Sequence, residues 1–125
     1  MAKYVFILFS FSFAVVTVGP DGPPTYHFAT IQAAIDSVTV NPIDIDIEVY
    51  PNPANYTENL LIEADMNISS FGGAGVTIID GGRTLNSTIV IRPASESPIK
   101  PNVNINGFTI RNGTGTDIER EIDTP

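Results

Sequence analysis

Only one segment of this 125-residue chain carries the hydrophobic period of an α-helix. The segment covers residues 28–38, FATIQAAIDSV. Its apolar side chains at helical spacing are Phe28, Ile31, Ile35 and Val38. Thr30 is placed to cap the amino end, and Asn41-Pro42 ends the pattern. We therefore expect one short amphipathic helix, with strands and turns making up the rest of the fold.

Short apolar runs separated by Gly, Pro and Asn clusters follow that helix. The clearest is residues 44–50, where Ile45, Ile47 and Val49 alternate with acidic side chains. The other predicted strands are residues 15–18, 58–62, 66–70, 76–79, 88–91, 103–105 and 108–111. Strands this short, with turn residues between them, predict an all-β protein.

Two of these strands share a motif. Thr77–Gly81 and Thr109–Gly113 both read T-I-x-[D/N]-G, and they lie 32 residues apart. Short strands at quasi-regular spacing indicate a solenoid whose single helix covers the open N-terminal end. The alternative is a sandwich in which the two strand-turn units are unrelated.

The order of these segments, from about residue 15 to 115, resembles the start of right-handed parallel β-helix proteins of the pectin lyase-like superfamily. The resemblance rests on Val16–Gly19, Thr30–Asp36, Ile47–Pro51, Tyr56–Leu60, Gly72–Gly75, Thr77–Gly81 and Gly107–Gly113. It implies an all-β fold, namely the N-terminal portion of a right-handed parallel β-helix (solenoid) with one short capping α-helix.

The resemblance is less specific for activity, because the superfamily includes pectin methylesterases, pectate lyases and surface proteins without known activity. The order of segments is similar to the start of the methylesterases. Their catalytic aspartates, arginine and glutamine lie on rungs after the one that ends at Asn112, and no position here matches them. We therefore assign no catalytic residue and expect no cofactor. Calcium enters only by analogy with the lyases.

The resemblance implies the N-terminal part of a secreted or cell-surface β-helix protein that is associated with polysaccharide. The alternative is a fragment of a pectin-active enzyme, first a pectin methylesterase and second a pectate lyase, with its catalytic rungs beyond residue 125. The polar tail, residues 116–125, shows no capping period. We therefore expect further rungs or a partner chain to cover the last strand edge.

The N-terminus has the layout of a signal peptide. Lys3 precedes an uncharged apolar run of 15 residues, Tyr4–Val18, which is short for a stable membrane span. Small residues suit cleavage after Ala14, so residues 1–14 are the expected signal and 15–115 the folded part. The alternative is an apolar first strand.

The net charge and the cysteine content exclude several classes of partner and binding site. Six Lys and Arg stand against 14 Asp and Glu, giving a net charge of −8. Nucleic-acid binding and attachment to an anionic membrane both need a basic surface, so neither is expected. The absence of cysteine excludes disulfides and thiolate metal sites.

Several residues are candidates for binding or modification. Three carboxylates share one strand face, namely Asp44, Asp46 and Glu48. A pair such as Asp44 and Asp46 is a weak candidate for a Ca²⁺ site, the alternative being a solvated acidic face.

Four Asn-x-Ser/Thr sequons are possible N-glycosylation sites, and they begin at Asn55, Asn67, Asn86 and Asn112. The alternative is a fold that places Asn in turns and Thr in strands, which generates the same Asn-x-Ser/Thr spacing without glycosylation.

Other candidates have structural alternatives. His27 is a lone histidine for which the sequence places no catalytic partners. Three arginines could bind a sugar carboxylate, the alternative being pairing with nearby acidic side chains; they are Arg83, Arg92 and Arg111. Three tyrosines could stack on sugar rings, the alternative being packing at strand corners; they are Tyr26, Tyr50 and Tyr56. The asparagines expected to form internal ladders between rungs are Asn59, Asn102, Asn104, Asn106 and Asn112.

Overall fold

The computed structural model describes residues 15–115, which form mostly strands in parallel sheets, together with one helix. The expected signal peptide and the polar tail lie outside the described residues. The elements are β1 (Val16–Val18), α1 (Ile31–Val40), β2 (Asp46–Val49), β3 (Tyr56–Thr57), β4 (Leu60–Ile62), β5 (Met66–Ser70), β6 (Ile78–Asp80), β7 (Ile89–Ile91), β8 (Val103–Asn106) and β9 (Thr109–Arg111).

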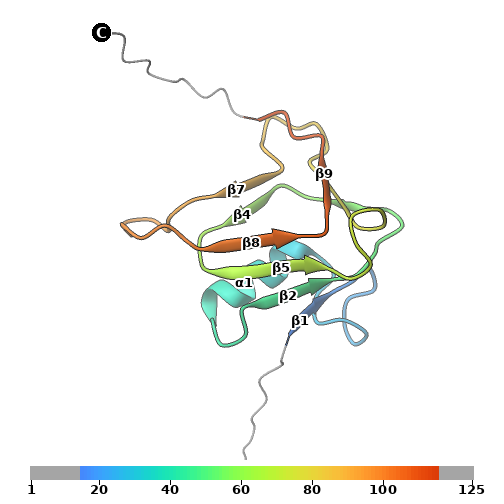
Figure 1. Cartoon of the computed structure of the whole chain (residues 1–125), viewed down its shortest axis with the longest axis horizontal. Coiled ribbons are helices and arrows are strands. Elements are labelled where there is room, and N and C mark those ends of the chain that lie inside the picture. The colour runs from blue at the N-terminus through green and yellow to red at the C-terminus, as the bar shows by residue number, and fades with distance from the viewer. Residues whose placement is uncertain (1–14, 116–125) are drawn as a thin grey trace, which may run out of the picture.

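The strands form three sheets, and every pairing between neighbouring strands is parallel (Figure 1). Sheet A has the order β1-β2-β5-β8, sheet B the order β3-β6-β9 and sheet C the order β4-β7. From β2 onward the chain visits the sheets in the sequence A, B, C, A, B, C, A, B. From β2 to β6, each strand therefore pairs with the strand three places later along the chain, and β1 pairs with β2 across the intervening helix.

Alternation within each strand separates the core from the surface. In sheet A, Ile47 pairs with Ile68, and Ile68 pairs with Ile105, so that apolar side chains stack on one face. The residues between them face outward. The strand predicted at residues 66–70 is confirmed with those bounds, whereas the two-residue strand β3 was not predicted as a separate element.

The register of the strands in sheet B differs by one residue from a direct alignment of the two copies of the sequence motif. The strands of the two T-I-x-[D/N]-G copies do pair, as β6 with β9, but Ile78 lies opposite Thr109 and Ile79 lies opposite Ile110. The motif would have aligned Ile78 with Ile110. Because side chains alternate with a period of two, the inward series is Thr77 and Ile79, and a one-residue slip would turn it outward.

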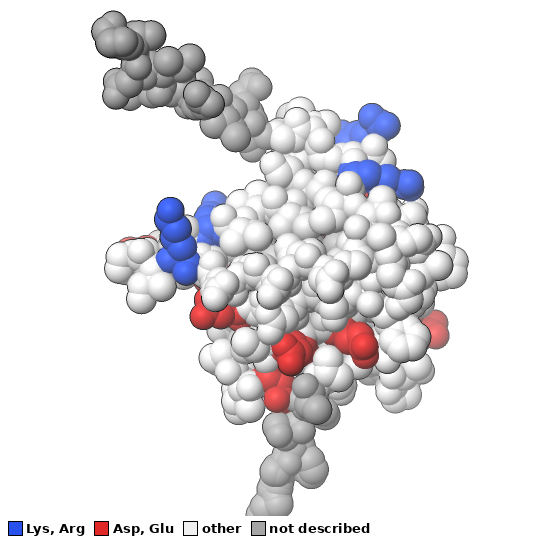
Figure 2. Space-filling model, in the orientation of Figure 1, with Lys and Arg blue, Asp and Glu red and all other residues white. Residues whose placement is uncertain are grey.

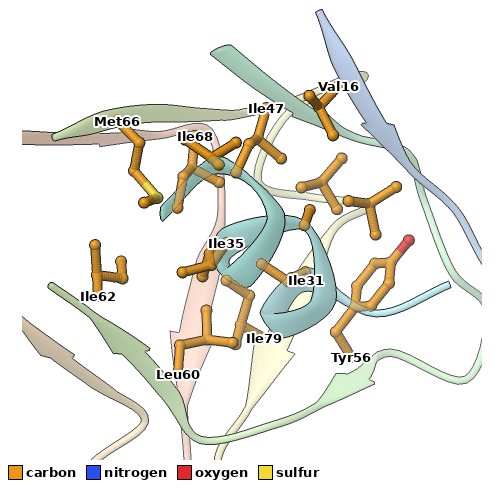
Figure 3. Close-up of a cluster of buried hydrophobic side chains, with 14 residues drawn as sticks. Val16, Ile31, Ile35, Ile47, Tyr56, Leu60, Ile62, Met66, Ile68 and Ile79 are labelled. Carbon is orange, nitrogen blue, oxygen red and sulfur yellow. The ribbon is translucent and has the colours of Figure 1, made fainter. Parts of the chain in front are cut away.

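Side chains from all three sheets and from α1 form one hydrophobic core (Figure 3). Ile31 and Ile35 of the helix pack against buried residues of the strands. The buried apolar residues are Val16, Val18, Ile31, Ala34, Ile35, Val38, Ile47, Val49, Tyr56, Leu60, Ile62, Met66, Ile68 and Ile79. The helix contacts β1, β2 and β4, and it therefore covers one end of the stacked strands.

The helix begins and ends close to the predicted bounds. The Oγ1 of Thr30 accepts a hydrogen bond from the Ala33 N–H at 3.2 Å, which confirms Thr30 as the N-cap. The Glu58 carboxylate accepts the N–H groups of Ile31 at 2.8 Å and Gln32 at 2.9 Å. Within residues 15–115, no helix has the length and apolar character needed to cross a membrane.

Gln32 joins the helix to the edge of sheet C. Its side-chain Oε1 accepts the Leu61 N–H at 2.9 Å, and its Nε2 donates to the Leu61 carbonyl oxygen at 3.1 Å. These are the two groups that the outer side of β4 would otherwise leave unpaired. The amide of Gln32 therefore replaces a neighbouring strand at this position.

The opposite end of the core is more open in the described residues. Ile62 and Ile79 are fully buried, but their strand partners Ile91 and Ile110 are 46% and 47% exposed. The apolar stack therefore continues to β7 and β9 without a covering layer from within residues 15–115.

Replacing Glu58 by Ala should destabilise the fold by about 1–2 kcal/mol, because two amino-terminal N–H groups of α1 lose a charged acceptor. Urea unfolding followed by circular dichroism measures the change. Glu96→Ala, at an exposed loop position, is the matched control. Equal stability of the two variants would contradict the capping role of Glu58.

The register of sheet B can be tested on adjacent residues of one strand. Ile79→Ala should cost about 2–5 kcal/mol because it leaves a cavity in the core. Ile78→Ala, on the outward face, should cost about 1 kcal/mol or less. The opposite order of the two unfolding free energies would show that the strand is turned by one residue.

Candidate functional site

The outer face of sheet A is a polar surface built from four parallel strands. Neighbouring strands of a sheet lie about 4.8 Å apart, so outward side chains at paired positions form rows across the strands. One row contains Asp46, Asn67 and Asn104. The second row contains Thr17, Glu48, Ser69 and Asn106. The surface therefore offers carboxylate, amide and hydroxyl groups at regular spacing.

The acidic residues of this face do not form a metal cluster. The Asn67 Nδ2 donates to Asp46 Oδ1 at 2.7 Å, so this carboxylate is used in a cross-strand hydrogen bond. Asp44 precedes the strand. Residues 15–115 contain no group of three or more His, Cys, Asp or Glu side chains that could hold a metal ion. The three-carboxylate arrangement considered from the sequence is not brought together as a cation site.

An aromatic stack lies at the carboxyl ends of β2 and β5. The Tyr26 and Tyr50 ring centroids are 5.0 Å apart, and the Tyr50 and Phe71 centroids are 4.7 Å apart with 21° between the ring planes. We call these three residues the aromatic stack. Gly19 makes room for it, because a Cβ there would lie 2.1 Å from the Tyr26 ring. Phe71 is 52% exposed and presents its ring to solvent.

Glu48 links the polar face to the aromatic stack. The Tyr50 hydroxyl donates a hydrogen bond to Glu48 Oε1 at 3.1 Å. This hydrogen bond, together with desolvation and the nearby negative charge, raises the pKa of Tyr50 above its ordinary value. At neutral pH, Tyr50 is therefore a neutral donor held against a carboxylate.

Tyr56 does not belong to this surface. Its side chain is 3% exposed, and its hydroxyl donates to the Tyr50 carbonyl oxygen at 2.6 Å. Burial raises the pKa of Tyr56 to about 12. Of the three tyrosines considered from the sequence, Tyr56 is a core residue, whereas Tyr26 and Tyr50 pack at strand corners in the stack.

His27 has a structural position beside β1. The ring Nδ1 of His27 accepts a hydrogen bond from the Thr17 backbone N–H at 2.9 Å. The backbone N–H of His27 donates to Thr17 Oγ1 at 3.1 Å. A pocket of about 400 Å³ adjoins it. The pocket walls are mainly apolar and come from Val16, Pro23, Pro24, Tyr26 and Phe28, with His27 and Ser37 as the polar members.

Two of the three candidate arginines are engaged by acids. Arg92 Nε lies 2.9 Å from Glu63 Oε2, and Arg111 Nε lies 3.0 Å from Asp80 Oδ2. The Gly82 N–H and the Arg111 guanidinium, with smaller effects from Asn112, hold the pKa of Asp80 below its usual value. Both pairs lie outside sheet A, on strands of sheets B and C and their adjoining residues.

The asparagines do not form the expected internal ladder. Asn104 and Asn106 point outward and are exposed on β8. Asn59 instead donates to the carbonyl oxygens of Gly81 and Ser87 at 3.3 and 3.0 Å. The outward direction follows from the strand alternation, which turns Val103 and Ile105 toward the core.

The sequon asparagines differ in their surroundings. Asn67 and Asn86 are exposed, whereas Asn55 and Asn112 are half-buried. The Asn112 Nδ2 donates to Asp80 Oδ2 at 3.0 Å. Glycosylation at these four positions remains a prediction from the sequence.

Phe71 is the aromatic member of the site that sequence reasoning missed, and the hydroxyl residues Thr17 and Ser69 were not candidates either. A signal is present, because Tyr50 ends one predicted strand and Phe71 directly follows another. Their proximity depends on the pairing of Val49 with Ser70, which the sequence pattern alone does not specify.

Comparisons of the chain with protein-family models, with curated proteins and with solved structures found no match.

Titration of the tyrosines tests the contact between Glu48 and Tyr50. The neutral Tyr50 hydroxyl is stabilised, so this contribution to stability is complete below about pH 10 and is lost as the pH rises through the folded pKa. Glu48→Gln should move the Tyr50 pKa back toward 10 and leave Tyr56 near 12. NMR titration of ¹³C-labelled tyrosine measures both. An unchanged Tyr50 pKa in this variant would contradict the contact.

Proposed function

We propose that residues 15–115 are the N-terminal cap and first rungs of a right-handed parallel β-helix. A rung here is one pass of the chain through sheets A, B and C. The proposal is supported by the repeated order A, B, C in which the chain visits its sheets, with parallel pairing at every step. In this arrangement α1 caps the first rung, and further strands cover the exposed apolar residues of β7 and β9.

The protein is proposed to be secreted or displayed at the cell surface and to associate with polysaccharide there. Export is supported by the layout of residues 1–18, and polysaccharide by the family resemblance of the chain. The observation that carries the binding proposal is the aromatic stack beside the polar outer face of sheet A. No catalytic step is assigned to the described residues.

The chemistry of this surface suits a sugar chain. Aromatic rings pack against the C–H faces of sugar rings, and Phe71 offers such a ring in a half-exposed position. The amides of Asn67 and Asn104 can both donate to and accept from sugar hydroxyls. Packing against Tyr50 holds the Phe71 ring in place before a ligand arrives, which lowers the entropy cost of binding.

Affinity electrophoresis of the full chain in gels containing soluble plant and microbial polysaccharides tests this proposal. Phe71→Ala should weaken retardation by about fivefold, equivalent to roughly 1 kcal/mol for one lost ring contact. Leu85→Ala removes an apolar side chain that is 90% exposed on the β6–β7 loop and is the matched control. Failure of every polysaccharide to retard the protein, or equal effects of the two variants, would overturn the proposed binding surface.

A further inference from the structure

Charge is distributed unevenly between the two halves of the described chain. Residues 15–82 contain no Lys or Arg. Their acidic residues are Asp21, Asp36, Asp44, Asp46, Glu48, Glu58, Glu63, Asp65 and Asp80. The cations of the described residues all come later and are Arg83, Arg92, Lys100 and Arg111. Figure 2 shows acidic side chains over the β1–β2 side of sheet A, with basic side chains at the margins of the same view.

The acidic side chains include two at the centre of the candidate site. Asp46 and Glu48 both project outward from β2, and Glu48 is hydrogen-bonded to Tyr50 of the aromatic stack. A sugar ring packed on the exposed ring of Phe71 therefore lies on the same side of sheet A as the Glu48 carboxylate, next to the tyrosine that Glu48 binds. A carboxylate carried by that sugar would face like charge from Glu48, and from Asp46 in the neighbouring row.

None of the four cations of the described residues lies on a strand of sheet A. Arg92 is on the segment after β7 and pairs with Glu63, and Arg111 is on β9 and pairs with Asp80. Arg83 and Lys100 lie on the β6–β7 and β7–β8 loops. The cations that could bind a sugar carboxylate are therefore either paired with an acidic side chain or located outside the strands of sheet A.

We infer that the polysaccharide recognised by the outer face of sheet A is uncharged, meaning a neutral or fully esterified glycan rather than a polyuronate. This inference rests on the proposed function and specifies its ligand class. Hydroxyl groups of a neutral glycan can donate to Asp46 and Glu48, so the same carboxylates that repel an acidic chain bind a neutral one. Selectivity then comes from repulsion of the wrong ligand as much as from contacts with the right one.

One backbone in two charge states tests the inference directly. Homogalacturonan is used fully methyl-esterified and fully de-esterified, with a neutral galactomannan as a third probe, and binding to the full chain is measured by calorimetry at low ionic strength. The esterified and neutral probes should bind, and the de-esterified probe should bind at least about tenfold more weakly. Equal or tighter binding of the de-esterified chain, with or without added Ca²⁺, would overturn the inference while supporting polysaccharide binding. Absence of binding to all three probes would overturn the proposed function itself.

Charge-neutralising variants make the test specific to this face. Asp46→Asn and Glu48→Gln should each raise the affinity for the de-esterified chain relative to the esterified chain by about fivefold. Glu96→Gln removes an equal charge from the β7–β8 loop and should leave that ratio unchanged. The same ratio in all three variants and the parent protein would show that discrimination does not arise at the outer face of sheet A.

Discussion

The side-chain amide of Gln32 pairs with both backbone groups of Leu61 in the way that a neighbouring strand would. A parallel sheet that starts with β4 has a row of open donors and acceptors on its outer side, and leaving them unpaired invites other strands to bind. One glutamine on the first turn of α1 meets this need for Leu61, and the Glu58 carboxylate in turn binds the amino end of the same helix. The two contacts fix α1 over β1, β2 and β4, and its apolar face then completes the core at that end.

This cap has consequences for the surface on the other side of sheet A. With Ile31 and Ile35 packed against the inner face, Ile47 and Ile68 must point inward. The alternation of the strands then turns Glu48 and Asn67 outward, and a slip by one residue would exchange the two sets. The polar rows and the aromatic stack are therefore products of the same register that buries the core. This dependence connects the helix to the proposed polysaccharide surface, although the two share no residue.

Much of the fold could be predicted from the sequence where a local pattern carried the information. The helix with its Thr30 cap and the alternation around Ile47 depend on neighbours within a few residues, and both were placed correctly. The pairing of the strands depends on more distant residues. An alignment of the two T-I-x-[D/N]-G copies would place Ile78 opposite Ile110, whereas the structure pairs Ile79 with Ile110. The local pattern places Asn104 in the interior, whereas the strand alternation turns it outward. The contact of Phe71 with Tyr50 likewise depends on the pairing of Val49 with Ser70. Those features depend on contacts between residues that are far apart in the chain.

Amide hydrogen exchange at Leu61 tests most directly whether a helix side chain closes the edge of sheet C. The contact with Gln32 predicts that the Leu61 N–H is protected in the native protein to an extent comparable with amides inside sheet A. It also predicts that Gln32→Ala makes this amide exchange much faster, while amides of β5 keep their protection. Rapid, unprotected exchange of Leu61 in the native protein would contradict the cap, and with it the account of how the first strands are held in register.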